Sequence, residues 1–171
     1  MVTRRRVGGA LDSQLRAGGS YDIWLYSIEE ESGEPFISSE ADERAGVFSP
    51  DGRSLAYQSD ETGEHNIYVR PLSGSGVAAR VSPDGGRYPE WRRDGRELFY
   101  MRPDGTIMAV AFEPDSGFGE PSELFRVAMR PTEAYDAFDV APDGERFLVL
   151  ERTGPQAPLT LVQNWPALLD R

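Results

Sequence analysis

The chain contains no cysteine and no lysine, and His65 is its only histidine. Without cysteine there is no disulfide framework, no cysteine-ligated zinc and no thiol nucleophile. Without lysine the chain lacks a Schiff-base amine and the lysine that grips phosphate in nucleotide-binding loops. A catalytic triad would have to use His65 as its base, yet a lone polar residue in such a turn-rich stretch is usually exposed surface. We therefore predict that the protein is not an enzyme and that it binds no cofactor and no metal.

Long apolar runs and a basic charge balance are missing as well. No run approaches membrane-spanning length, and the stretch 7–12, after the basic start, is too short and too polar for a signal-peptide core. As written, the sequence predicts a cytoplasmic protein without membrane insertion. The alternative is an extracytoplasmic location, if the chain is cut from a longer membrane-anchored protein. The formal net charge of −11 disfavours nucleic acid and anionic membranes as partners.

What the chain does contain is one short phrase that occurs three times, at 48–57, 91–100 and 140–149. In each phrase an apolar residue ends a run, an Asp-Gly pair follows, and apolar or aromatic residues then resume. Asp caps backbone N–H groups in such turns and Gly takes the left-handed position, so each phrase predicts a β-hairpin. Asp51, Asp94 and Asp143 are therefore expected to bond turn backbone rather than a ligand or a metal.

Two further series of apolar runs recur at about the same spacing as this motif. Together with the hairpin they complete a four-stranded unit. Third strands are predicted at 22–26, 66–70, 106–110 and, more weakly, 158–162. Fourth strands are predicted at 35–38, 79–82 and 123–126. A strand-rich unit that repeats every 40–50 residues or so, about the spacing of these phrases, is typical of β-propeller blades.

Counting these strands gives two whole blades and an incomplete blade at each end of the chain. The whole blades are predicted at about 44–82 and 87–127. The C-terminal blade, at about 135–163, has three strands, and the N-terminal blade has at most three, if 6–11 is a degraded second strand. The sequence thus predicts an all-β fold, a partial β-propeller of about three and a half four-stranded antiparallel blades.

At this point the residues carry a resemblance to a known family. Phe48–Tyr57, with Asn66–Arg70 after it, resembles the TolB-like, WD40-like propeller repeat. Gly85–Tyr100, Phe138–Val149 and the ending Leu159–Leu168 resemble one particular setting of that repeat, the C-terminal half of the sensor propeller of bacterial serine/threonine protein kinases. The resemblance covers 21–169, the predicted propeller, whereas the N-terminal segment 1–20 matches poorly.

The resemblance implies a non-catalytic module that binds a ligand or a protein. Kinase activity is not implied, because the chain has no His-Arg-Asp catalytic loop, no Asp-Phe-Gly and no lysine to hold ATP. Two alternatives stay open: an accessory propeller fragment of a prolyl-oligopeptidase-type peptidase, and a Tol-type envelope scaffold. The first would be supported by a Gly-x-Ser-x-Gly elbow, which the chain lacks. The second needs an export signal.

If the chain binds something, the axial channel of the propeller is the place to look, because the innermost strands line it. Arg44, Arg87 and Asp136 hold equivalent places ahead of these strands. The predicted ligand-binding residues of the channel rim are Arg44, Arg87, Tyr88, Tyr135 and Asp136. Arginine and tyrosine suit carboxylates, peptides or sugars. The alternative is that the two arginines pair with Glu43 and Glu90 at the surface.

The incomplete blades at the two ends predict self-association. The N-terminal blade lacks its first strand and the C-terminal blade its fourth, so two copies can complete each other. Exposed sheet edges and apolar faces favour such pairing, and two-fold symmetry is the commonest in oligomers. A homodimer is therefore expected, with a protein, a peptide or a small ligand as the other partner.

Overall fold

The structure is a computed structural model that describes residues 11–12, 20–73, 76–127 and 138–149. Within these residues the protein is all-β: fourteen strands form antiparallel sheets and no helix occurs. No helix of the described part is therefore long and apolar enough to cross a membrane. The predicted all-β class is confirmed.

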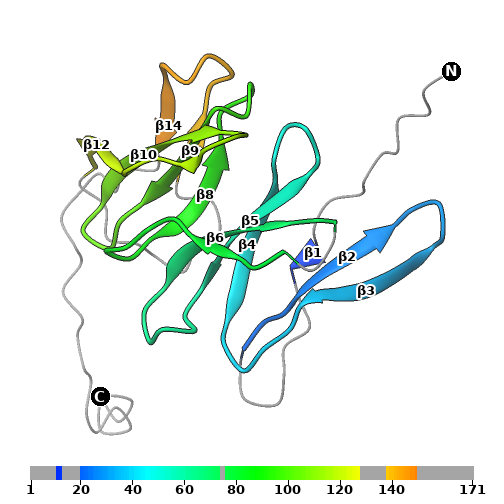
Figure 1. Ribbon diagram of the computed structural model, residues 1–171. Coiled ribbons are helices and arrows are strands. Elements are labelled where there is room, and N and C mark those ends of the chain that lie inside the picture. The colour runs from blue at the N-terminus through cyan, green and yellow to red at the C-terminus, as the bar shows by residue number, and fades with distance from the viewer. Residues whose placement is uncertain (1–10, 13–19, 74–75, 128–137, 150–171) are drawn as a thin grey trace, which may run out of the picture.

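Four sheets follow one another along the chain, from the β2–β3 hairpin at the right of Figure 1 to β14 at the upper left. The first contains β1 (Leu11–Asp12), β2 (Ile23–Ser27) and β3 (Ser32–Ile37). The second contains β4 (Glu43–Phe48), β5 (Ser54–Ser59), β6 (Asn66–Pro71) and β7 (Ala79–Arg80). Each of these sheets keeps its strands in chain order.

The third sheet is the largest and carries one element that the repeat did not predict. It contains β8 (Arg87–Trp91), β9 (Glu97–Met101), β10 (Thr106–Glu113), β11 (Gly117–Phe118) and β12 (Ser122–Arg126). Both β11 and β12 pair with the long strand β10, at different places along it. The unpredicted β11 is held by Phe118, whose ring centroid lies 4.7 Å from that of Phe112 and 6.0 Å from that of Trp91.

The fourth sheet is the hairpin of β13 (Phe138–Val140) and β14 (Phe147–Val149). The rest of the predicted C-terminal blade, including the weak third strand at 158–162, lies outside the described residues. At the other end, β1 pairs with β2, and the remainder of the predicted strand at 6–11 is also outside them. The division into a segment 1–20 and a propeller 21–169 stays a prediction.

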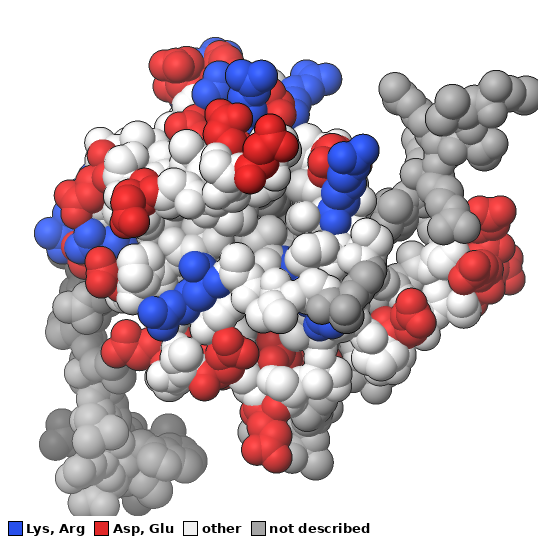
Figure 2. All heavy atoms as spheres, viewed as in Figure 1, with Lys and Arg blue, Asp and Glu red and all other residues white. Residues whose placement is uncertain are grey.

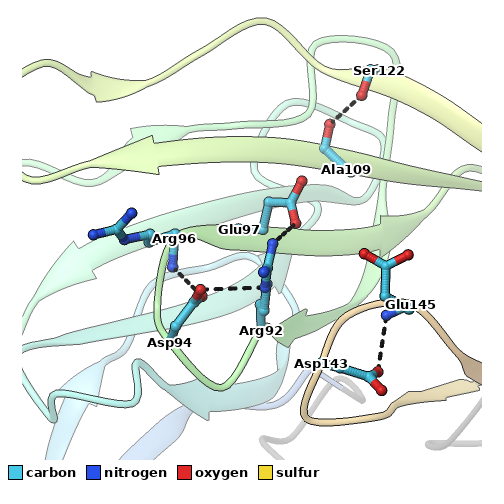
Figure 3. Close-up of polar contacts among 8 residues, drawn as sticks. All are labelled: Arg92, Asp94, Arg96, Glu97, Ala109, Ser122, Asp143 and Glu145. Atoms are coloured by element: carbon cyan, nitrogen blue, oxygen red, sulfur yellow. Dashed lines mark hydrogen bonds and ion pairs between the residues drawn. The ribbon is translucent and has the colours of Figure 1, made fainter.

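The three Asp-Gly turns close as the sequence predicts. Each aspartate accepts a hydrogen bond of 3.0 Å from the backbone N–H two residues later: Asp51 from Arg53, Asp94 from Arg96 and Asp143 from Glu145 (the last two in Figure 3). The glycines that follow have φ of 68°, 74° and 75°, a region that favours glycine. The prediction that these aspartates bond turn backbone is confirmed.

The core lies between successive sheets, because each central strand is buried on both faces. In β5, Leu55 and Tyr57 pack toward Ile23 of the first sheet. Ala56, which points to the opposite face, packs toward Leu98 of the third sheet. A third cluster joins the third sheet to Phe138 of the fourth. Such face-to-face stacking explains why the strand after each turn is apolar at successive positions rather than at alternate ones.

Candidate functional site

The innermost strands β4 and β8 each contain a β-bulge at the same point. The register of β4 against β5 shifts between Arg44 and Val47, and that of β8 against β9 shifts between Arg87 and Glu90. Inside the bulges, Ala45 and Tyr88 have φ of 52° and 57°. A non-glycine residue in this region costs on the order of 1–3 kcal/mol, and such strain is typical of functional sites.

The two bulges border one cavity. Its volume is about 110 Å³. It is lined by Asp42, Arg44, Ala45, Gln58, His65, Arg87 and Tyr88. That volume is several times the roughly 30 Å³ that one water takes up in the liquid, but well short of the ~300–1,000 Å³ of a pocket for a drug-sized molecule. The cavity therefore admits one small polar group at a time.

Arg44 is held in place by its neighbours. Its Nε lies 2.7 Å from Oδ2 of Asp42, and its guanidinium carbon lies 4.2 Å from the centre of the Tyr21 ring. Asp42 is anchored in turn: Oδ1 accepts the Tyr21 backbone N–H at 2.9 Å, and its own backbone N–H donates to Oδ1 of Asp60 at 2.8 Å. The charge of Arg44 is thus already balanced.

Arg87 differs from Arg44 because it makes no ion pair with any described residue. It is half-buried and lines the cavity beside His65. Burial, and after it the positive field of Arg87, lowers the pKa of His65 below its ordinary value. The imidazole is therefore neutral near pH 7, and Arg87 supplies an unbalanced positive charge at the cavity wall.

Gln58 adds a fixed polar group to the same wall. The residue is only 4% exposed, and its side-chain oxygen accepts the Tyr88 backbone N–H at 3.2 Å. This bond turns the amide NH₂ away from Tyr88, and the NH₂ donates to no described residue. Because Gln58 lines the cavity, a ligand or water there can accept from this NH₂ group. The cavity thus presents unused hydrogen-bond donors.

A metal ion is the competing occupant. Ligand atoms of Asp42, Asp60 and His65 all lie within 4.8 Å of one another, and this oxygen and nitrogen set suits a divalent ion. However, both carboxylates already accept backbone N–H groups, and Asp42 also holds Arg44. A cation would have to displace one guanidinium and tolerate another. The two guanidinium groups and the engaged carboxylates therefore disfavour a cation at this position.

The structure brings three of the five predicted rim residues together. Arg44, Arg87 and Tyr88 line the cavity, whereas Tyr135 and Asp136 lie outside the described residues. Arg44 pairs with Asp42, and Glu43, which the alternative placed at the surface, is 1% exposed and accepts a hydrogen bond from the Ser39 hydroxyl. That the three rim residues bind a ligand stays a prediction.

Sequence reasoning missed four residues of the cavity: Asp42, Ala45, Gln58 and His65. The expectation that His65 is plain surface is wrong, because the following blade covers it: its carbonyl accepts the Gly86 N–H at 2.8 Å, and its Nδ1 is buried without a partner among the described residues. Gln58 did carry a signal, as a polar residue at the end of an otherwise apolar run.

On the surface, acidic side chains gather at the tip of the β2–β3 hairpin (Figure 2), where Glu29, Glu30 and Glu31 are exposed. Elsewhere on the visible face acidic and basic groups are interspersed. Three exposed like charges in full contact with water do not form a specific binding site, so we do not assign one to the hairpin tip.

Comparison with known proteins supports a TolB-like β-propeller fold. No family model matches the sequence, and no curated protein does. Among solved structures, TolB from Acinetobacter baumannii matches with a TM-score of 0.62 and 16% identity over 85% of this chain and 35% of that one. A putative TolB from Agrobacterium tumefaciens matches with a TM-score of 0.50 and 21% identity, over 63% of this chain and 42% of that one.

A third match is the propeller domain of the Trilobed protease from Pyrococcus furiosus, which is described as having an open velcro topology. Its TM-score is 0.50 at 20% identity, over 68% of this chain and 38% of that one. At these identities the likeness shows the fold alone. The chain spans less than half the length of each of these structures. The fold prediction of a partial β-propeller is thereby confirmed.

Proposed function

We propose that this chain is a non-catalytic binding module, and that its ligand or protein partner engages the cavity between β4 and β8. One observation carries the proposal: Arg87, which precedes the strained Tyr88 of the β8 bulge, is a half-buried guanidinium without an ion-pair partner among the described residues. A structural arginine would be expected to have its charge matched, as Arg44 does. An unmatched one suits a group that arrives from outside.

The finer setting is also a proposal. The sequence phrases favour the C-terminal part of a kinase-associated sensor propeller. The alternatives are an accessory propeller of a prolyl-oligopeptidase-type peptidase and a Tol-type envelope scaffold. All three give the propeller the same binding role and differ in the domain to which it is joined. A longer gene with an upstream kinase, hydrolase or export signal would decide among them and would also settle the location.

Ligand-induced thermal stabilisation tests the binding role. A panel of small acids, sugars and short peptides is screened on the wild-type chain, on Arg87→Ala and on Arg93→Ala. Arg93 is an exposed arginine outside the cavity, and so a matched control. A ligand at about 100 times its Kd stabilises by about 2.7 kcal/mol. We expect this gain in the wild type and in Arg93→Ala and its loss in Arg87→Ala. Ligands that stabilise all three equally would contradict the proposal.

Catalytic inactivity is tested separately. With no lysine and no cysteine, and with one histidine that lacks a nucleophile partner among the described residues, we expect no hydrolysis of ATP or of activated esters. Turnover that is present in the wild type and disappears in His65→Ala would show that the cavity is an active site.

A further inference from the structure

We propose that the cavity between β4 and β8 binds one carboxylate group at the end of a larger ligand, held by the Arg87 guanidinium and the Gln58 side-chain amide. This inference rests on the proposed binding function and adds the chemical class of the group that is recognised. It is argued from the size of the cavity, from its donors and from the charges around it.

The size of the cavity sets the first limit. About 110 Å³ accepts a carboxylate and a little of the chain behind it, but not a sugar ring with its hydration or a nucleotide. Because Arg44, His65 and Arg87 are only half-buried, the cavity communicates with solvent. The body of the ligand therefore stays outside, on the rim, and only its end group enters.

The donors set the second limit. Arg87 presents the planar fork of N–H groups that matches the two oxygens of a carboxylate. The Gln58 amide is buried to 4% exposure and is oriented by the Tyr88 N–H, so its NH₂ group is held ready for an acceptor. No described residue occupies either donor set. A ligand that only donates hydrogen bonds, such as an amine, would instead meet these donors and the positive charge of Arg87.

The charges separate carboxylate from phosphate. Asp42 lines the cavity, whereas Asp60 does not line it but lies beside Asp42 and His65. Arg44 balances Asp42, which leaves Arg87 as the single unmatched positive charge. The lining residues alone, with Asp42 paired to Arg44, carry one net positive charge, and a singly charged carboxylate neutralises it. Phosphate carries more negative charge and would leave the lining net negative, with Asp60 beside His65, so it should bind more weakly.

His65 couples the binding to pH. The groups that act on it are Arg87 and Arg44, which disfavour its protonation, and Asp60 and Asp42, which favour it. A bound carboxylate offsets the field of Arg87, so the pKa of His65 rises on binding. Affinity should therefore increase as the pH falls from 7 toward 5, with uptake of a proton by the complex. Arg87 and the carboxylate at a peptide C-terminus both keep their charge throughout that interval.

The test is a titration of the 171-residue chain, followed by NMR, with four probes: sodium acetate, inorganic phosphate, zinc chloride, and an acetylated tri-alanine peptide as its free acid or its C-terminal amide. Acetate reports a free small acid and the peptide pair reports a chain-terminal carboxylate. We expect the free-acid peptide, and acetate more weakly, to shift the Tyr88 backbone and Gln58 side-chain amide signals. The amidated peptide should bind at least about tenfold more weakly.

Variants assign the effect to Arg87. Arg87→Gln should lower the affinity for the free-acid peptide about tenfold or more, Arg87→Lys should lose less because it keeps the charge without the fork, and Arg93→Gln should change nothing. If Arg87→Gln does not fold, Arg87→Lys and the peptide pair still decide. Equal binding of acid and amide, tighter binding of phosphate, or a zinc complex that excludes acetate would each overturn the inference.

These outcomes are separable from a failure of the proposed function. A ligand that needs Arg87 but carries no carboxylate would keep the binding role and overturn only the chemical class. If no probe and no member of the thermal panel depends on Arg87, the binding role at this cavity is itself refuted.

Discussion

Replacing Gly86 by alanine tests how tightly the second and third sheets are joined at the cavity. A Cβ added at Gly86 would lie 2.8 Å from Oγ of Ser82 and 2.9 Å from Cγ1 of Ile67. Both neighbours are 0% exposed, and the Ser82 hydroxyl is fixed because it accepts the Ile67 N–H at 2.7 Å. Neither can move aside cheaply, so the backbone of Gly86 must shift instead.

That shift has a cost and a functional consequence. Overpacking of a filled core costs about 1–3 kcal/mol, while the reduced freedom of the unfolded chain returns about 0.4–1 kcal/mol. We expect a net loss of about 1–2 kcal/mol, or roughly 2–8 °C in Tm for a chain of this size. Because Gly86 donates to the His65 carbonyl and precedes Arg87, ligand affinity should fall as well.

Urea denaturation followed by circular dichroism measures the effect. Gly119→Ala is the matched control, since a Cβ there meets its nearest atom, the Ala111 carbonyl oxygen, at an ordinary 3.8 Å. It should change the unfolding free energy by no more than about 0.5 kcal/mol, or stabilise slightly. Equal stability of Gly86→Ala and Gly119→Ala would refute the reasoning, because it would mean that the junction at Ser82 is loosely packed.

Three further predictions concern charge and assembly. Asp42→Asn keeps an acceptor for the Tyr21 N–H but removes the charge that balances Arg44, so acetate affinity should rise several-fold by titration while Tm falls; an unchanged affinity would contradict the charge balance. The Glu145 N–H lowers the pKa of Asp143, and hydrogen bonds from Thr106 lower that of Asp104. Their folded pKa values lie below the unfolded ones, so this stability is full above about pH 4 and is lost as the pH falls through the folded pKa values. Urea midpoints that do not decline between about pH 5 and 2 would speak against it. Light scattering at several concentrations should give a homodimer, and a compact monomer throughout would exclude one.

The architecture could be predicted well from the sequence because each blade depends on local turn and strand patterns that recur along the chain. A turn that needs an aspartate side chain and a left-handed glycine produces the same Asp-Gly pair in the sequence each time, as at Asp51 and Asp94. The strand after each turn is buried on both faces, so its residues are apolar at successive positions. What the repeat could not predict is β11, which depends on a contact between Phe118 and Phe112 in one blade only.

The site was predicted only in part, for a physical reason. The repeat identifies Arg44 and Arg87 as equivalent positions, and the structure places both on one cavity. The partners of the cavity come from other strands and turns: Gln58 from the end of β5, and His65 from the turn that meets Gly86 of the next blade. No local pattern reports such contacts between blades. The two bulges could not be predicted from the sequence either, because the residues at positive φ, Ala45 and Tyr88, are not glycines.

The difference between the two arginines can nevertheless be traced to two positions in the chain. Two residues before Arg44 stands Asp42, and two residues before Arg87 stands Gly85. Beside the second sheet the Asp42 carboxylate reaches the Arg44 guanidinium at 2.7 Å and balances its charge. Ahead of β8 in the third sheet, Gly85 takes a φ of +83° to turn the chain and offers no side chain. The same repeat therefore builds one arginine that is paired within the fold and one, Arg87, that we propose binds a ligand.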